Sequence, residues 1–176
     1  MRVVAGVAGG RRLQAPAGRQ LRPTSERVRE AVFNSLGSLD AVVGATVLDL
    51  FAGTGALGIE ALSRGAGSAT FVDADLRAVH AIEENLGATG LGERARVVHA
   101  DVFRFLADRP PATVDLAFAD PPYAFDDWST LLERLPARLV ALEARSHIEL
   151  GPGWTPLRSR RYGDTVVTLA RRLEEG

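Results

Sequence analysis

Two short clusters in the chain carry residue types that could do chemistry together. In the first, Asp49 shortly precedes a glycine-rich stretch that contains Gly53, Thr54 and Gly55. The second is the run Asp-Pro-Pro-Tyr at residues 120–123. A glycine-rich turn lets the backbone approach a ligand closely, and a carboxylate beside it can hold a cation or a hydroxyl group. The two clusters predict one ligand pocket, provided that the fold brings them together.

The glycine-rich stretch alone fits two cofactors. Residues 53–58 satisfy the pattern G-x-G-x-x-G, and Asp73 ends the next apolar run, where an acid can bind a ribose hydroxyl. A dinucleotide and S-adenosylmethionine both need these features, whereas a purely structural turn would need the glycines alone. Asp49 favours S-adenosylmethionine, because a carboxylate here would repel a pyrophosphate and suit the ammonium group of a methionine moiety. The chain is also too short for a nicotinamide domain with a separate substrate domain.

A further acid follows the third apolar run of this region. Asp101 is placed where the adenine of a bound cofactor would lie. It is equally well placed to cap a helix over residues 102–107. The two roles are compatible, and both are expected.

The Asp-Pro-Pro-Tyr run follows the apolar residues 116–119. Two prolines cannot continue a central strand, so the chain must turn out at the carboxyl edge of a sheet, where doubly wound sheets bind ligands. The exocyclic amine of a nucleobase is a poor nucleophile because its lone pair is conjugated with the ring. Hydrogen bonds to the Asp120 carboxylate and the Pro121 carbonyl would orient a tetrahedral nitrogen. Tyr123 would stack on the base, and Pro122 would fix the turn.

The elements that must position these clusters alternate between strands and helices. Apolar and β-branched runs predict strands at residues 46–51, 69–72, 96–99, 116–119 and 146–150. Helical spacing predicts helices at residues 56–64, 76–86, 102–107 and 128–142. Two last strands, at 157–162 and 165–171, flank a Gly-Asp hairpin signal. This order predicts an α/β, Rossmann-like sheet of seven strands, mostly parallel, with helices on both faces and a closing antiparallel hairpin.

The N-terminal part differs from this core in charge. All 21 basic residues of the chain are arginines, and residues 1–30 hold seven of them against two glutamates, a net +5 that leaves −6 for the rest. We expect a small hairpin over residues 2–15, turning at Gly9-Gly10, and a helix that begins at Thr24 or Ser25. A basic arm on an acidic body predicts an anionic partner such as a phosphate backbone, although exposed arginines also aid solubility. The candidate RNA contacts are Arg2, Arg11, Arg12, Arg19, Arg27 and Arg29.

Composition excludes several other classes. With 176 residues, the chain has the length of one domain, which we divide into a basic extension, residues 1–44, and a core, residues 45–176. No cysteine is present, so disulfides, cysteine-ligated zinc and a thiolate nucleophile are ruled out. The three histidines are far apart, and we expect no metal. Without a membrane-length apolar run or an apolar signal core, a cytoplasmic protein is expected.

These clusters resemble a known group of enzymes. Asp-Leu-Phe-Ala-Gly-Thr-Gly at 49–55 and Asp-Pro-Pro-Tyr at 120–123 are similar to class I S-adenosylmethionine-dependent methyltransferases that act on exocyclic amines. That group includes adenine-N6, cytosine-N4 and guanine-N2 enzymes. The N-terminal runs 2–6, 10–13 and 21–34 narrow the match, because they resemble the bacterial 16S rRNA guanine-N2 methyltransferases of the RsmD type.

The resemblance implies a methyl transfer to N2 of guanine 966, in the usual rRNA numbering, on an assembled or assembling small ribosomal subunit. It implies that residues 120–123 form the amine site, and we expect a monomer. The implied cofactor site comprises Asp49, Phe51, Gly53, Thr54, Gly55, Asp73 and Asp101, with Arg22, Pro23 and Thr24 near the methionine end. One departure is Gly9-Gly10-Arg11-Arg12, where a basic residue on each side of a glycine is expected.

Two other hypotheses remain open at this stage. An adenine-N6 methyltransferase of DNA or RNA would use the same tetrapeptide. A non-catalytic RNA-binding assembly factor could retain the fold, but it would not need Asp49, Gly53, Gly55 and Asp120 intact. The 44 residues outside the core leave no space for a large sequence-reading domain, so the shape of a structured RNA must supply most of the specificity.

Overall fold

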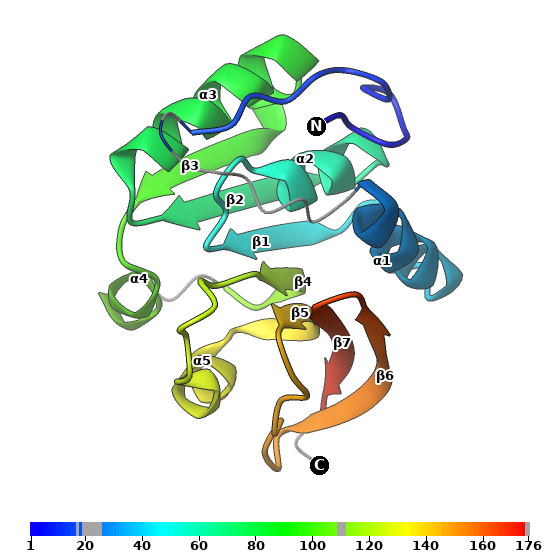
Figure 1. The fold of residues 1–176 in the computed structure, drawn as a ribbon, viewed down its shortest axis with the longest axis vertical. Coiled ribbons are helices and arrows are strands. Elements are labelled where there is room, and N and C mark those ends of the chain that lie inside the picture. Colours follow the sequence, from blue (N-terminus) through cyan, green and yellow to red (C-terminus); the bar gives the residue numbers. More distant parts are fainter. Residues whose placement is uncertain (17, 19–25, 109–111, 175–176) are drawn as a thin grey trace.

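In a computed structural model, the structure describes residues 1–16, 18, 26–108 and 112–174. Seven strands within this part of the chain form one sheet in the order β3-β2-β1-β4-β5-β7-β6 (Figure 1). The strands are β1 (Thr46–Leu50), β2 (Ser68–Asp73), β3 (Ala95–His99), β4 (Val114–Ala119), β5 (Ala137–Ala144), β6 (Trp154–Tyr162) and β7 (Thr165–Arg172). The helices are α1 (Glu26–Ser38), α2 (Ala56–Ser63), α3 (Leu76–Thr89), α4 (Val102–Asp108) and α5 (Trp128–Arg134), with a short 3₁₀ turn, η1 (Gly92–Arg94).

The sheet is parallel from β3 to β5 and antiparallel at β7 and β6. The order of strands reverses between β1 and β4, which is the switch point where doubly wound sheets open a crevice for a ligand. The predicted class of fold is therefore confirmed, including the antiparallel hairpin that closes the sheet.

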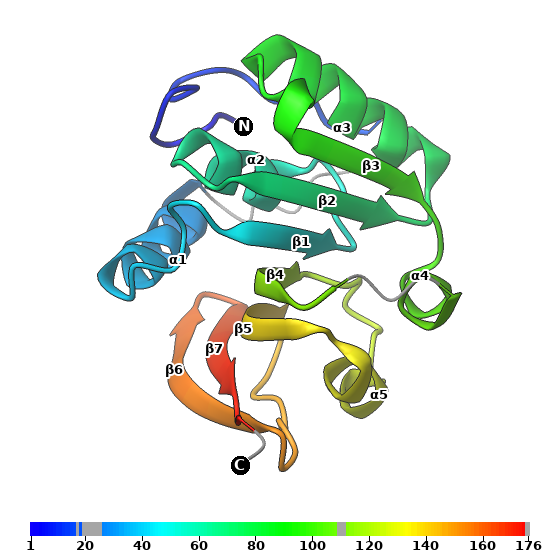
Figure 2. The same ribbon diagram turned by 180° about the vertical axis from the view of Figure 1, so that it is seen from behind.

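Helices cover both faces of the sheet. Helices α1, α2 and α3 pack on one face, and α4 and α5 pack on the other (Figures 1 and 2). Alternate residues of a strand therefore belong to different cores: Leu116 and Phe118 face α1, whereas Ala117 and Ala119 face α5. Among the described residues, no helix combines the length and the apolar character that a bilayer crossing requires.

Two predicted elements are wrong. The expected helix 128–142 ends at Arg134, and residues 137–144 form strand β5 instead. Pro136 stops the helix, because proline disfavours helical geometry in the preceding residue and lacks the N–H that a helix needs. The expected strand 146–150 is irregular and only connects β5 to β6. The fifth parallel strand thus lies about ten residues earlier than its pattern suggested.

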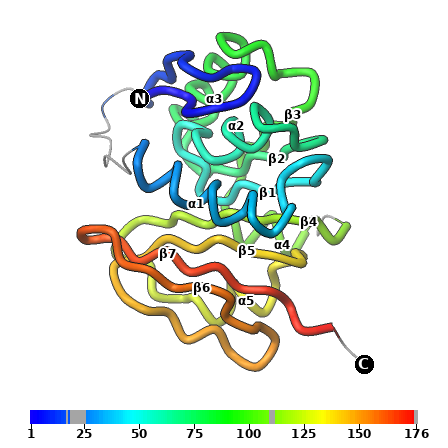
Figure 3. The backbone as a smooth tube through the Cα atoms, turned by 90° about the vertical axis from the view of Figure 1, so that its right-hand side faces the viewer, coloured from blue at the N-terminus to red at the C-terminus, as the bar shows by residue number. Residues whose placement is uncertain are grey.

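The predicted N-terminal hairpin is present but short: one antiparallel bridge joins Arg2 to Arg12, and backbone hydrogen bonds connect residues 1–3 with residues 10–13. The segment packs against α2 and α3, at the opposite end of the molecule from β6 (Figure 3). Gly6 has a φ of 85°, and an added Cβ would lie 2.0 Å from the Ser63 carbonyl oxygen. Only glycine allows this approach to α2. The buried Glu60 carboxylate also fixes the N-terminal segment, because it accepts hydrogen bonds from the backbone N–H groups of two residues in that segment.

Candidate functional site

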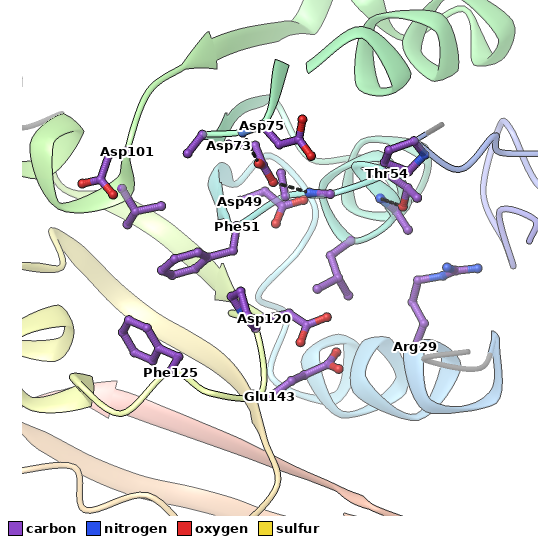
Figure 4. A pocket seen from close by; sticks show the side chains of 18 of the residues that line it. Arg29, Asp49, Phe51, Thr54, Asp73, Asp75, Asp101, Asp120, Phe125 and Glu143 are labelled. Carbon is purple, nitrogen blue, oxygen red and sulfur yellow. Dashed lines mark hydrogen bonds between the residues drawn. The ribbon is translucent and has the colours of Figure 1, made fainter. Parts of the chain in front are cut away.

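A cavity of about 630 Å³ opens at the carboxyl ends of the parallel strands (Figure 4). Both predicted clusters reach it, although they are far apart in the sequence. Of the residues expected from the sequence, its lining includes Asp49, Phe51, Gly53, Thr54, Asp73, Asp101, Asp120 and Pro122. The strand ends bring these side chains together because β1, β2 and β4 are parallel neighbours.

Asp49 lies on β1 at the centre of this cavity and is 2% exposed. Its Oδ2 accepts a hydrogen bond of 2.9 Å from the backbone N–H of Gly58, in the first turn of α2. Burial raises the pKa of the Asp49 carboxyl well above its usual value; the Gly58 hydrogen bond opposes this shift, and the carboxylates of Asp120 and Asp73 add to it. Three acidic groups around one cavity favour a ligand that carries positive charge.

Asp73, at the end of β2, shapes the glycine turn. Its Oδ2 accepts a 2.9 Å hydrogen bond from the N–H of Gly53, and its Oδ1 accepts one of 2.9 Å from the N–H of Asp75. The carboxylate is therefore fixed between two backbone donors while it lines the cavity. This geometry fits the expected role of Asp73 as the partner of a ribose hydroxyl.

Asn85, on α3, connects the glycine turn to the N-terminal segment. Its Nδ2 donates to the Thr54 carbonyl at 2.9 Å and to the Gln14 carbonyl at 3.0 Å, and its Oδ1 accepts from the Gln14 N–H at 2.7 Å. Met1 and Pro16 of the same segment line the cavity. The N-terminal segment therefore contributes to the lining of the cofactor pocket.

One end of the cavity is aromatic. The ring centroid of Phe125 lies 5.4 Å from that of Phe51 and 6.0 Å from that of Phe103, and all three residues line the cavity. Phe51 adopts a φ of 55°, a left-handed conformation that is costly for a bulky residue and typical of functional turns. Asp101 lies at this end as well, and its Oδ1 caps α4 by accepting a hydrogen bond from the Arg104 N–H. A flat heteroaromatic group suits these rings.

At the other end of the cavity, Asp120 and Glu143 lie side by side. Ala119 pairs with Leu142 between β4 and β5, so the residues that follow them are neighbours at the sheet edge. Both side chains line the cavity and point toward α1 (Figure 4). Glu143 is 3% exposed.

Arg29 corrects one expectation. We expected it to contact RNA from the surface of the extension, but its side chain is 2% exposed and lines the cavity. Its Nη2 donates to the Arg2 carbonyl, and its Nε lies 3.4 Å from Oε2 of Glu60. Burial lowers the pKa of this guanidinium, and the negative charge of Glu60 opposes that shift. The other candidate arginines that the structure describes, Arg2, Arg11, Arg12 and Arg27, are exposed.

Of the rest of the Asp-Pro-Pro-Tyr turn, Pro122 lines the cavity. Pro121 is buried, whereas Tyr123 is 41% exposed and lies beside the cavity rather than in its lining. The guanidinium carbon of Arg145 sits 3.8 Å from the centroid of the Tyr123 ring and covers one face of it. Gly55 also lies outside the lining and starts α2 in a left-handed conformation.

Some expected residues cannot be placed, and others were missed. Arg19, Arg22, Pro23 and Thr24 lie outside the described residues. Sequence reasoning missed Glu143, because its strand was predicted as part of a helix, and it missed Phe103 and Asp75 in the lining. Pro136 was the available signal for Glu143, since it separates the helix from an apolar run that ends in this acid.

The fold and this pocket define a class I S-adenosylmethionine-dependent methyltransferase. The acidic centre suits the positive charge of that cofactor, the Asp73 carboxylate suits its ribose, and the aromatic end suits its adenine. S-adenosylmethionine is accordingly the cofactor of the protein.

Comparisons with known proteins identify the family. The family model described as conserved hypothetical protein 95 matches residues 1–171, and the chain belongs to this family, which includes the RsmD-type methyltransferases. Ribosomal RNA small subunit methyltransferase D of Escherichia coli K12 is 42% identical over 186 aligned positions, which cover 100% of this chain and 92% of the relative.

Solved structures agree with this assignment. The Escherichia coli protein yhhF, a candidate methyltransferase, superposes with a TM-score of 0.87 and 32% identity over 99% of each chain. A hypothetical protein of Thermus thermophilus, TTHA0928, gives a TM-score of 0.81 and 36% identity, over 96% of this chain and 98% of that one.

Proposed function

We propose that this protein transfers a methyl group from S-adenosylmethionine to N2 of guanine 966 in 16S rRNA, within an assembled or assembling small ribosomal subunit. The observation that carries the proposal is the Asp-Pro-Pro-Tyr turn, which leaves β4 beside the acidic cofactor pocket. The Escherichia coli relative, named as a small-subunit rRNA methyltransferase, supports the class of substrate.

Each residue of the Asp-Pro-Pro-Tyr turn has a separate role in the proposed reaction. S-adenosylmethionine supplies, when bound, a methyl group on a positively charged sulfur. The Asp120 carboxylate and the Pro121 carbonyl would accept hydrogen bonds from the two N–H groups of the target amine. The lone pair of the nitrogen would then be available for attack on the methyl group. As the nitrogen becomes positive, Asp120 stabilises the charge and accepts the proton late. Tyr123 would stack on the flipped base, and Arg145 lies against its ring.

Residues 1–44 would act as the RNA-contacting extension of the core at 45–176. Arg11 and Arg12 are exposed at the tip of the N-terminal segment, and Arg11 Nη1 donates to the carbonyl of Ala88 at the end of α3. Their guanidinium groups suit phosphate oxygens. The pocket opens at the other end of α3, beside Asp73 and Asp75, so phosphate binding at Arg11 and Arg12 would anchor the RNA at a distance from the site of reaction. We propose that the enzyme acts in this way as a monomer.

The test is transfer of labelled methyl from S-adenosylmethionine to small subunits that lack their native methylation. Bare 16S rRNA and duplex DNA are assayed in parallel, and digested nucleosides are identified by mass. N2-methylguanosine at position 966, formed mainly on the particle, is the expected result. N6-methyladenine would contradict the proposal, and cofactor binding without any transfer would favour the non-catalytic assembly factor.

Two variants sharpen this test. Asp120→Ala should lose most of the rate and still bind the cofactor. Asp126→Ala removes an exposed carboxylate a few residues away and serves as the matched control, with activity close to that of the wild type. Equal activity of the two variants would remove Asp120 from the mechanism.

A further inference from the structure

Glu143 is a carboxylate of the pocket to which the proposed reaction gives no role. Glu143 ends β5, is 3% exposed and lines the cavity next to Asp120. The register between β4 and β5 makes the two residues neighbours, and adjacent strands lie about 4.8 Å apart. Figure 4 shows that the two carboxylates point to the same side of the sheet. The place expected for the target base therefore offers two adjacent hydrogen-bond acceptors rather than one.

Two adjacent acceptors match only one of the nucleobases that carry an exocyclic amine. In guanine, the amine at C2 is next to N1–H, which is a second donor. In adenine and cytosine, the ring nitrogen next to the amine carries a lone pair and accepts hydrogen bonds. An ionised carboxylate can accept but cannot donate, so that lone pair would face a negative charge with no bridging proton.

We infer that Glu143 is a specificity-determining residue, which accepts a hydrogen bond from N1–H of the target guanine while Asp120 accepts from its N2 amine. The inference rests on the proposed function, because it assumes that a base enters this end of the cavity. The residue at the end of β5 would then select guanine among the bases, and the turn after β4 would select an exocyclic amine.

The surroundings of Glu143 suit this role. The residue pairs with Val167 of β7, and its neighbour Leu142 pairs with Ala119 of β4, so the strand that carries it is held on both sides. A side chain on such a strand is positioned more rigidly than one on a loop. Arg29 lines the same cavity, and the negative charge of Glu143 acts to raise the pKa of this guanidinium. The two charges therefore interact within the cavity.

The experiment uses small subunits whose target position carries either guanine or 2-aminopurine. The second base keeps the N2 amine but has a lone pair at N1 and no oxygen at C6. The kcat/KM for methyl transfer is measured on both particles with the wild-type protein and with Glu143→Gln. The glutamine amide has nearly the same shape and can donate a hydrogen bond to N1. The missing C6 oxygen affects both proteins alike, so it cancels when the two preference ratios are compared.

We expect the wild type to prefer guanine on the order of 10–100-fold, which is typical of one well-placed polar contact to a base edge. Glu143→Gln should reduce this preference at least tenfold. Glu133→Gln, an exposed glutamate on α5, is the matched control and should keep the wild-type ratio. Each ratio is taken within a single variant, so a lower folded fraction of Glu143→Gln does not alter it.

Two results would overturn the inference while the proposed function stands. They are a wild-type protein that methylates both bases equally well, and a Glu143→Gln variant that retains the full wild-type preference for guanine. Failure of the wild type to methylate guanine in any particle would instead refute the proposed function, and the inference would fall with it.

Discussion

Replacement of Asn85 tests how the N-terminal segment supports the cofactor pocket. The side chain is fully buried on α3, and its three hydrogen bonds join Gln14 to Thr54 of the glycine turn. Asn85→Ala removes all three and leaves the buried Thr54 carbonyl and the partly buried backbone groups of Gln14 without these partners. We expect the protein to lose stability and, separately, to hold the glycine turn less firmly.

The magnitude follows from the count of hydrogen bonds. Each intramolecular hydrogen bond contributes about 0.5–1.5 kcal/mol net, so the loss of three should lower the free energy of unfolding by about 2–4 kcal/mol. For a protein of this size, that corresponds to a fall in Tm of about 5–15 °C. Only one of the three bonds, the one to Thr54, touches the cofactor turn directly. S-adenosylmethionine affinity should therefore fall by about 1 kcal/mol, a factor of about five.

Urea and thermal unfolding measure the first effect, and calorimetric titration with S-adenosylmethionine measures the second. Asn34→Ala is the matched control, because Asn34 is exposed on α1 and should change stability by less than about 0.5 kcal/mol. Asn85→Asp keeps the shape and the acceptor but places a carboxylate against two carbonyl groups, so it should be at least as destabilised. An Asn85→Ala protein with the wild-type Tm and the wild-type cofactor affinity would refute the reasoning.

The remaining predictions concern the pocket and the extension. Because burial raises the pKa of Asp49, the folded protein binds this proton more tightly than the unfolded chain does. Stability without cofactor should therefore fall as pH rises through the raised pKa, affinity for the cationic cofactor should rise over the same range, and Asp49→Asn should flatten both profiles. Thermal unfolding and calorimetry at several pH values check this, and profiles that Asp49→Asn leaves unchanged would contradict it. Gly58→Ala would place a Cβ 2.4 Å from a neighbouring phenylalanine ring and should cost about 3 kcal/mol in urea unfolding, whereas Gly87→Ala, which meets open space, should cost nothing. Equal midpoints for these two variants would show that the ring moves aside. Replacement of both Arg11 and Arg12 by Ala should weaken RNA binding and reduce the slope of its salt dependence by about 1–2, as titration at several salt concentrations would show. An unaltered slope would place the phosphate contacts elsewhere.

The two clusters of the pocket were predictable because their signals are local. The glycine turn follows a β-branched run and precedes a helix, and the two prolines after residue 119 force the chain out of the sheet. The carboxyl ends of parallel strands share one edge, so a correct order of strands and helices was enough to bring Asp49 and Asp120 together.

The same reasoning failed where local patterns are ambiguous. Residues 137–144 contain good helix formers, and their periodicity alone does not distinguish a buried strand from the end of a helix. The assignment as a strand depends on pairing with β4 and β7, which lie far away in the sequence. Glu143 could not be located until that pairing was known.

Composition, the two motifs and the alternation of elements were sufficient to predict the class of fold, the cofactor and acidic residues that line the pocket. Only the tertiary structure located Arg29 and Glu143 in the lining of the pocket. An arginine among six others in a basic extension reads as a surface residue, yet packing of α1 buries it against Glu60. Burial and strand register depend on contacts between segments that are distant in the chain. Such contacts produce no periodic pattern in the sequence around Arg29 or Glu143.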